Sequence, residues 1–535
     1  MKEADLLLLG GRIYTPGDKA TFQEGLGIRD GRIIAVGTNS EMESLGGRET
    51  KRIHLGGKLV LPGFRETHLH PASAGLLRTS WIDCNGSRSI EAILKAVETK
   101  AATARPSAWI RGQGYDESRL SEGRAPNRWD LDRVAPRNPV AITKRDGHVM
   151  VVNSMALDLA RIDRETPDPS GGLIYRNSDG VPNGILGEKA KALVEGVIPK
   201  PTLEEQKEGI RSAQRLLVSY GITSYDEALV TRGEIQAYQE LRKEGQLILR
   251  VGLILSGNFV EEPIAADAMR AGFTTGFGDS WLSFKGIKLI ADGSMASETA
   301  ATYDSYTKSG GKGKMILARE DLVPLIRTYV QAGIRPCIHA IGDRAVDEVV
   351  SAISEVNRTI STQESRVRIE HCGLVTKEAL ENIKSLNVMV SSTYSLLYIA
   401  GDNHRDLIPS KVFNQYYPCR SYFDRGIVVA SNSDWPSTPP NPMLSIYAVM
   451  TRMTEKGFRY PGNETVSIQE ALRMFHENAA YVDFEEDRMG SLSPGKFADL
   501  AVFADDLFTI EPKELLNAKP VMVMVGGEVV YSDLS

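Results

Sequence analysis

Cysteine and long apolar runs are both scarce in this chain of 535 residues. The 4 cysteines (Cys84, Cys337, Cys372 and Cys419) are far apart and form no CxxC pair. We therefore do not expect a secreted fold held together by disulfides. We expect the protein to lie in the cytoplasm, a reducing compartment. The apolar run Leu6–Leu9 is too short for a signal peptide, and no stretch of about 18 apolar residues occurs. We expect a soluble protein without a membrane partner.

An excess of basic charge is also missing. The chain has 63 basic and 69 acidic side chains, a net charge of −6, which argues against a nucleic-acid partner. Charged residues make up 25% and apolar residues 42%, values that exclude wholesale disorder. At roughly 100–200 residues per domain, the length predicts two or three domains.

Both ends of the chain show short β-type segments separated by turn dipeptides. Asp30-Gly31 and Gly526-Gly527 each lie between two apolar runs, as in tight hairpins. We expect residues 1–62 and 490–535 to form one small β-sandwich. The alternative is two unrelated pairs of strands.

The middle of the chain alternates candidate strands with amphipathic helical segments. Alternation over eight strands predicts an α/β fold, a (β/α)8 barrel of the TIM type, although a doubly wound sheet gives the same pattern. The candidate strands are 59–64, 221–228, 249–255, 287–290, 334–340, 366–372, 387–393 and 426–434.

One gap is too long for a barrel connection. About 130 residues rich in Gly, Pro, Asn and Asp separate Pro71 from Leu203. We expect an inserted α+β subdomain at 106–202, with the barrel formed by 63–105 and 203–489. Insertions after a barrel strand emerge at the catalytic end, so this one is expected to cover the active site.

Metal-type ligands end several of the candidate strands. His68 and His70 are two residues apart, so both imidazoles point to the same side of a strand. His339, His371 and Asp434 close three further strands, whose last residues reach the top of a barrel. Four imidazoles and a carboxylate suit zinc or a similar divalent ion, with manganese, iron and cobalt as alternatives.

Five segments of the sequence resemble the amidohydrolase superfamily, in the branch that contains N-substituted formamide deformylase. They are LPGFRETHLHP, IHAIGDRAV, RIEHC, SNSDWP and SPGKFADLAVF. The resemblance covers nearly the whole chain. It implies that His68 and His70 bind one ion, that His339 and His371 bind a second, and that Asp434 contacts the metal site and shuttles protons.

The resemblance also implies a CO2-derived carbamate on Lys288, bridging two metal ions. A carbamate is anionic and offers two oxygens, whereas an ammonium group cannot ligate a cation. Lys285 is a competitor, and alternation places it on the opposite face of the strand. The alternative for Lys288 is an ordinary ion pair with an acid such as Asp292.

Several positions depart from the family pattern or are less specific. Glu66 stands where the family usually has Asp, and His476 where relatives commonly have a small hydroxyl residue. His148, in the insert, is a candidate to hydrogen-bond the substrate, with a simple loop-capping role as the alternative. The remaining positions are Tyr115 and Asp116 (grouped with His148), His54 and His404 (surface or loop histidines), Asp343 (a helix N-cap) and Trp435 (pocket lining or rim packing).

These features together predict a metal-dependent hydrolase of a small molecule, cleaving a non-peptide C–N bond in an amide, N-formyl group or cyclic amide. A metal-activated hydroxide would attack, and Asp434 would shuttle the proton. The same site also suits ester or lactone hydrolysis, deamination, isomerisation or decarboxylation. A non-catalytic scaffold is the remaining alternative. Dimers are the commonest assembly, so a homodimer is expected.

Overall fold

The computed structural model describes residues 3–16, 21–145, 147–258 and 263–533. It forms two compact units, one of residues 1–71 with 214–535 and one of residues 72–213. Among the described residues, no helix combines the length and the apolar character needed to cross a bilayer.

Eight parallel strands form the central sheet of the first unit, in their order along the chain. The first and last strands lie against each other, because the Asp434 amide donates to the His68 carbonyl at 3.2 Å. The sheet is thus a nearly closed barrel, and each of the eight candidate segments contributes a strand. The strands are β8 (Phe64–Leu69), β15 (Ile222–Val230), β16 (Arg250–Ser256), β17 (Leu282–Ile290), β18 (Pro336–Ala340), β19 (Arg368–His371), β20 (Met389–Ser392) and β21 (Val429–Ser431).

The first predicted strand is divided between two sheets. Its first half is β7 (Leu59–Pro62), which pairs with strands from the ends of the chain, and the barrel strand β8 begins at Phe64. Gly63 joins the two, and a Cβ at this position would lie 2.2 Å from the Thr223 side chain. Only glycine fits this close approach of two strands.

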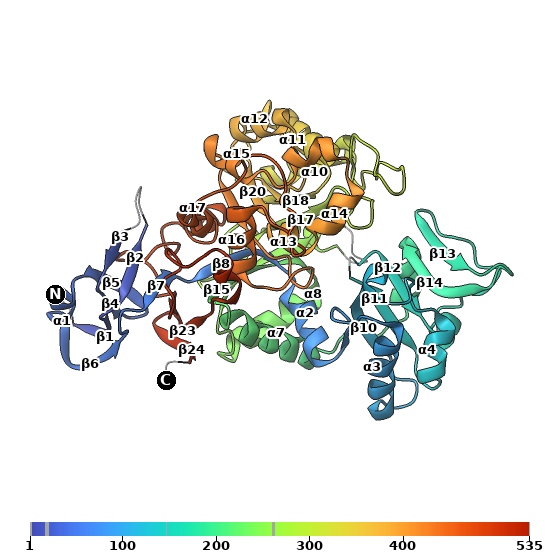
Figure 1. Cartoon of the computed structure of the whole chain (residues 1–535), viewed down its shortest axis with the longest axis horizontal. Helices are drawn as coiled ribbons and strands as arrows, with labels where there is room; N and C mark the ends of the chain where they lie inside the picture. Colours follow the sequence, from blue (N-terminus) through green and yellow to red (C-terminus); the bar gives the residue numbers. More distant parts are fainter. Residues whose placement is uncertain (1–2, 17–20, 146, 259–262, 534–535) are drawn as a thin grey trace. The chain divides into compact units, whose positions relative to one another are not determined.

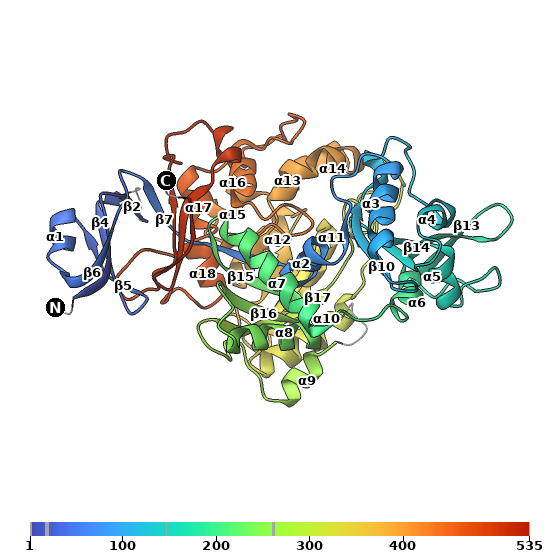
Figure 2. The same ribbon diagram turned by 90° about the horizontal axis from the view of Figure 1, so that it is seen from below.

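Helices pack outside the barrel strands. Among them, α8, α10 and α11 contact β17 and β18, and Figure 2 shows α8 and α10 alongside the strands. The helices of this unit are α8 (Arg232–Lys243), α9 (Ala265–Arg270), α10 (Arg319–Gln331), α11 (Asp343–Asn357), α12 (Lys377–Ser385), α13 (Ser395–Ile399), α14 (Gly401–Leu407), α15 (Cys419–Asp424), α16 (Pro442–Thr451), α17 (Ile468–Arg473) and α18 (Glu477–Val482).

Both ends of the chain contribute to one six-stranded sheet, with the order β24-β23-β22-β7-β2-β3. In Figure 1 the blue β7 lies beside the red β23 and β24. A second sheet, β5-β4-β1-β6, shares a hydrophobic core with it that includes Leu8, Ile28, Leu500 and Met524. The strands are β1 (Ala4–Leu9), β2 (Arg12–Thr15), β3 (Thr21–Gln23), β4 (Gly25–Arg29), β5 (Arg32–Gly37), β6 (Gly46–His54), β22 (Leu500–Phe503), β23 (Pro520–Val525) and β24 (Glu528–Ser532), with helix α1 (Asn39–Glu43).

The second unit has its own six-stranded mixed sheet. It begins at residue 72, earlier than the expected 106, and ends at 213 instead of 202. The boundary differs because α3 buries Ile93 and Val97 in the core of this sheet. Its elements are α2 (Pro71–Thr79), β9 (Ile82–Asp83), α3 (Ile90–Thr103), β10 (Ile110–Tyr115), α4 (Arg128–Val134), β11 (Val140–Lys144), β12 (Val149–Val152), α5 (Ser154–Leu159), β13 (Gly172–Arg176), β14 (Pro182–Glu188), α6 (Ala192–Glu195) and the first part of α7 (Leu203–Val218).

Candidate metal centre

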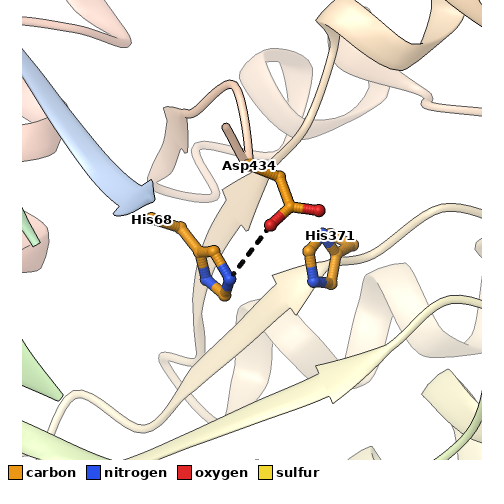
Figure 3. Close-up of side chains that lie close together, drawn as sticks. All are labelled: His68, His371 and Asp434. Carbon is orange, nitrogen blue, oxygen red and sulfur yellow. Dashed lines mark ion pairs between the residues drawn. The ribbon is translucent and has the colours of Figure 1, made fainter. Parts of the chain in front are cut away.

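Three side chains converge at the carboxyl ends of the barrel strands. His68 lies near the end of β8, His371 ends β19, and Asp434 follows β21. One potential ligand atom from each lies within 4.8 Å of the others, and Figure 3 shows the three groups pointing toward a common point. The dashed line joins His68 Nε2 to Asp434 Oδ1, 3.5 Å apart. Residues far apart in sequence therefore form one candidate cation site.

His70 lies against the same carboxylate. Its Nε2 is 3.2 Å from Asp434 Oδ1, and its Nδ1 lies 3.0 Å from the carbonyl oxygen of Ala228. A carbonyl oxygen is only an acceptor, so Nδ1 donates to Ala228, and Nε2 is the nitrogen that faces Asp434 and the candidate site. The ring centroids of His68 and His70 are 5.3 Å apart, as expected for two histidines on one side of a strand.

His339 is adjacent to the group but turned partly away. Its ring centroid lies 4.6 Å from that of His371. Its Nε2 lies 3.0 Å from the Gly293 carbonyl oxygen and 3.4 Å from Asp292 Oδ1. The structure thus brings His339 to the site without directing this nitrogen at Asp434.

Lys288 is buried beside His68. Its Nζ lies 3.1 Å from His68 Nε2. Asp292, the suggested alternative partner, instead accepts the backbone amides of Ala301, Ile341 and Gly342. The lysine therefore faces the candidate ligands.

Lys285 is buried as well. The pairing of β16 and β17 shifts register next to this lysine, so the two-residue period is interrupted. Its Nζ contacts Glu485 at 2.6 Å. Lys285 belongs to a different ion pair and does not compete for the site.

Burial sets the protonation of the histidines. It lowers the pKa of His68 to about 4 and that of His339 to about 3, so both rings are neutral at pH 7, the form that ligates metal. Burial also lowers the pKa of Lys288 to about 8. Although burial alone raises the pKa of Asp434, the hydrogen bond from His70 and the nearby His371 hold it well below its usual value. The site combines neutral imidazoles with an ionised carboxylate.

The backbone is strained at two of these positions. His371 has φ of 67° and Asp434 has φ of 51°, in the left-handed region that non-glycine residues rarely adopt. Such conformations cost about 1–3 kcal/mol each and cluster at functional sites. Strain at two strand-end residues supports a functional role for this rim.

Glu370 is a neighbour of the site that the sequence did not reveal. Its Oε2 lies 2.7 Å from His68 Nδ1, and Oε1 lies 2.6 Å from Arg368 Nε. Alternation would place the side chains of residues 370 and 371 on opposite sides of β19. The positive φ of His371 removes this constraint, so both side chains reach His68.

The two departures from the family pattern have different surroundings. Glu66 is buried, and its Oε2 accepts the Ser433 amide at 2.8 Å. Burial raises the pKa of this carboxyl to about 8. His476 is buried and stacks on Phe64, with ring centroids 5.3 Å apart. Glu66 touches the segment that carries Asp434, whereas His476 packs against Phe64, the first residue of β8.

The candidates in the insert lie in the second unit. His148 Nδ1 pairs with Glu188 Oε2 at 3.0 Å, and Tyr115 is buried. Asp116 caps a short 3-10 helix by accepting the Ser118 amide at 3.0 Å. A substrate contact by His148 stays a prediction.

The remaining candidates lie mostly outside the site. His54 is exposed, as predicted, but His404 is buried in α14 with Nδ1 2.8 Å from the Tyr416 hydroxyl, so its prediction as a surface histidine was wrong. Asp343 is the first residue of α11, one position inside the predicted N-cap, and accepts the Tyr303 amide. Trp435 is buried, and its carbonyl accepts the His70 amide.

The donor set fits a divalent metal ion. Neutral imidazole nitrogens and an anionic oxygen are the ligands that zinc and similar ions take in proteins. The atoms of His68, His371 and Asp434 are close enough for one ion to reach all three.

Comparison with known proteins agrees with this geometry. The amidohydrolase family matches residues 51–531. Protein LONG AFTER FAR-RED 3 of Arabidopsis thaliana is 27% identical, over 99% of this chain and 92% of its own. N-substituted formamide deformylase of Arthrobacter pascens is 26% identical, over 98% of both chains. A metal-dependent hydrolase from Pyrococcus furiosus has 27% identity and a TM-score of 0.76, over 94% of this chain and 100% of its own. With nearly its whole length matched, the chain belongs to the amidohydrolase family.

Proposed function

We propose that this amidohydrolase uses a divalent metal ion to hydrolyse a carbon–nitrogen bond other than a peptide bond, in an amide, N-formyl compound or cyclic amide. The observation that carries the proposal is the convergence of His68, His371 and Asp434 within 4.8 Å at the barrel rim. The name of the Arthrobacter relative, a deformylase of N-substituted formamides, supports the same bond type.

The ligands for the metal are the imidazoles of His68, His70, His339 and His371 with the carboxylate of Asp434. They hold one or two ions, zinc first, with manganese, iron and cobalt as alternatives. When bound, such an ion polarises a carbonyl group and makes water a stronger nucleophile near neutral pH. Because burial lowers the pKa of His68, His339 and His371, these three rings are neutral at pH 7 and lose no proton when metal binds.

Asp434 is the proton carrier in this proposal. Its carboxylate is ionised and 15% exposed, so it can accept a proton from water at the rim. The hydrogen bond to His70, with 3.2 Å between Nε2 and Oδ1, orients the carboxylate. The same oxygen then gives the proton to the leaving nitrogen, which departs as a neutral amine.

Lys288 supplies a carbamate in the dinuclear form of the proposal. The neutral amine of Lys288 adds to the carbon of CO2, an N–C bond forms, and one proton passes to solvent. The product is an anion with two oxygens, which offsets the charge of two cations. The burial of Lys288 beside His68 supports this assignment.

The test is a substrate panel assayed with metal-free protein refilled with each of the four metals. N-formyl, N-acyl and cyclic amides are compared with esters and lactones. We expect metal-dependent release of amine and a loss of about 10²–10⁴-fold in kcat for Asp434→Asn, which keeps the size of the side chain. Turnover of esters or lactones alone would change the bond class, and full turnover without metal would overturn the proposal.

We also propose a small-molecule substrate, a cytoplasmic location and a homodimeric state. All 4 cysteines are buried and unpaired, which supports a reducing compartment. Light scattering on the purified protein at micromolar concentration tests the dimer, and a monomeric mass would contradict it.

A further inference from the structure

A chain of buried charged groups runs through the barrel interior to His68. Arg368 and Glu370 are both fully buried, and they are joined by an ion pair of 2.6 Å between Nε and Oε1. The second oxygen of Glu370, Oε2, lies 2.7 Å from His68 Nδ1. One carboxylate therefore connects a buried guanidinium group to a candidate metal ligand.

The guanidinium group of Arg368 is held on every side. Its Nη1 contacts Asp226 Oδ2 at 3.1 Å and Asp483 Oδ1 at 3.0 Å. Its Nη2 donates to the Thr67 carbonyl at 2.9 Å, in the strand that carries His68. Arg368 thus connects strands β8, β15 and β19 to the segment after α18. Its ion pair with Glu370 holds that carboxylate in a fixed position.

The position of Glu370 determines which nitrogen of His68 carries the proton. A neutral imidazole has one donor and one acceptor nitrogen, and an ionised carboxylate only accepts. With Glu370 on Nδ1, the proton lies on Nδ1, and the lone pair is on Nε2, the nitrogen 3.5 Å from Asp434 Oδ1. Carboxylate partners of this kind orient metal-binding histidines.

Lys288 does not select a tautomer. Its Nζ lies close to both ring nitrogens of His68, 3.1 Å from Nε2 and 3.4 Å from Nδ1. The placement of the proton therefore rests on the contact between Glu370 and Nδ1.

We propose that Glu370 is a positioning residue, which holds His68 in the Nδ1-protonated form and aims Nε2 at the metal site. The inference rests on the proposed metal-dependent function, since a histidine needs aiming only if it binds a cation. Arg368, anchored by Asp226 and Asp483, keeps Glu370 in place. Asp483, near the C-terminal end of the barrel domain, therefore helps to position His68, a ligand near its N-terminal end.

A purely structural role for Glu370 is the alternative, in which it only neutralises Arg368. The two roles differ in metal affinity. Glu370→Gln keeps the shape of the side chain but removes the charge, and its amide can also donate to Nδ1, which would place the proton on Nε2. We expect zinc affinity, measured by competition with a chelator, to fall about 10–100-fold.

Asp499→Asn is the matched control. It breaks a buried ion pair of similar length, 2.7 Å between Asp499 Oδ2 and Arg250 Nε, with no candidate ligand in contact. We expect this variant to lose thermal stability and to keep the zinc affinity of the wild type. Wild-type zinc affinity in folded Glu370→Gln would overturn the proposal.

A measurement on the wild-type protein tests the position of the proton on His68 without relying on the Glu370→Gln variant or on the substrate panel. Nitrogen-15 NMR of histidine-labelled protein, with and without zinc, reports which nitrogen of His68 is protonated, and His68→Gln identifies its signal. We expect the proton on Nδ1 in both forms. A proton on Nε2 in the metal-free protein would overturn the inference, while a protein that binds no metal would overturn the proposed function.

Discussion

Glu66 Oε2 accepts a hydrogen bond of 2.8 Å from the backbone amide of Ser433, the residue directly before Asp434. The Ser433 hydroxyl lies 3.3 Å from the same oxygen. Asp434 itself adopts φ of 51°, a conformation that must be held by its surroundings. Glu66, whose side chain is longer than the Asp usual in the family, thus stabilises the strained turn that contains Asp434, the proposed proton carrier.

Removal of the Glu66 side chain is expected to lower kcat more than it lowers the metal content of the protein. In Glu66→Ala the Ser433 amide is left buried without its partner, at a cost of about 1–3 kcal/mol in the free energy of unfolding. The turn then relaxes, and Asp434 loses its orientation. Glu66→Gln keeps an acceptor oxygen and should retain most of the activity. Equal kcat values for the two variants would contradict this role.

His70→Ala is expected to abolish activity and metal binding while the fold is preserved. His70 is partly exposed at the rim, so its loss removes a ligand without opening the barrel core. The drop in zinc retention should exceed the about 10–100-fold typical of residues that only support a ligand. Elemental analysis and circular dichroism measure the two effects, with the exposed His54→Ala as control. Wild-type zinc content in His70→Ala would exclude His70 as a ligand.

Carbon dioxide is expected to be required for full metal reconstitution. Metal-free protein refilled in CO2-depleted buffer lacks the carbamate on Lys288, and activity should recover poorly until bicarbonate is added. Lys288→Ala should recover partially when a short carboxylic acid such as propionate is supplied, because the acid replaces the lost anion. Equal recovery with and without bicarbonate would count against the carbamate.

The barrel could be predicted from the sequence because its signal is local. Each strand is a short apolar or β-branched run between amphipathic helices, and this pattern does not depend on what the strand packs against. The division at Gly63 and the boundary of the second unit depend on packing partners. Helix α3 is amphipathic whether it covers a barrel or another sheet, so its sequence alone does not assign it.

The strand-end ligands were accessible to sequence reasoning, whereas their partners were not. Histidines that end apolar runs stand out in a chain with 8 of them. Glu370 did not stand out, because alternation directs it away from His371 unless the backbone adopts a positive φ. His404 was misjudged for a related reason: its burial depends on Tyr416, 12 residues away, which its own helix does not reveal.

Acid should destabilise the protein partly through His404. Burial lowers the pKa of this histidine to about 4. The unfolded chain, with a histidine pKa near 6.5, binds the proton first as pH falls. The stabilisation from neutral His404 is complete above pH 6.5 and decreases by about 1.4 kcal/mol per pH unit toward pH 4. In urea unfolding of metal-free protein, His404→Gln should therefore gain stability relative to the wild type over this range, and the exposed His54→Gln should not. A constant difference between wild type and His404→Gln from pH 7.5 to 4.5 would show that His404 is not protonated on unfolding.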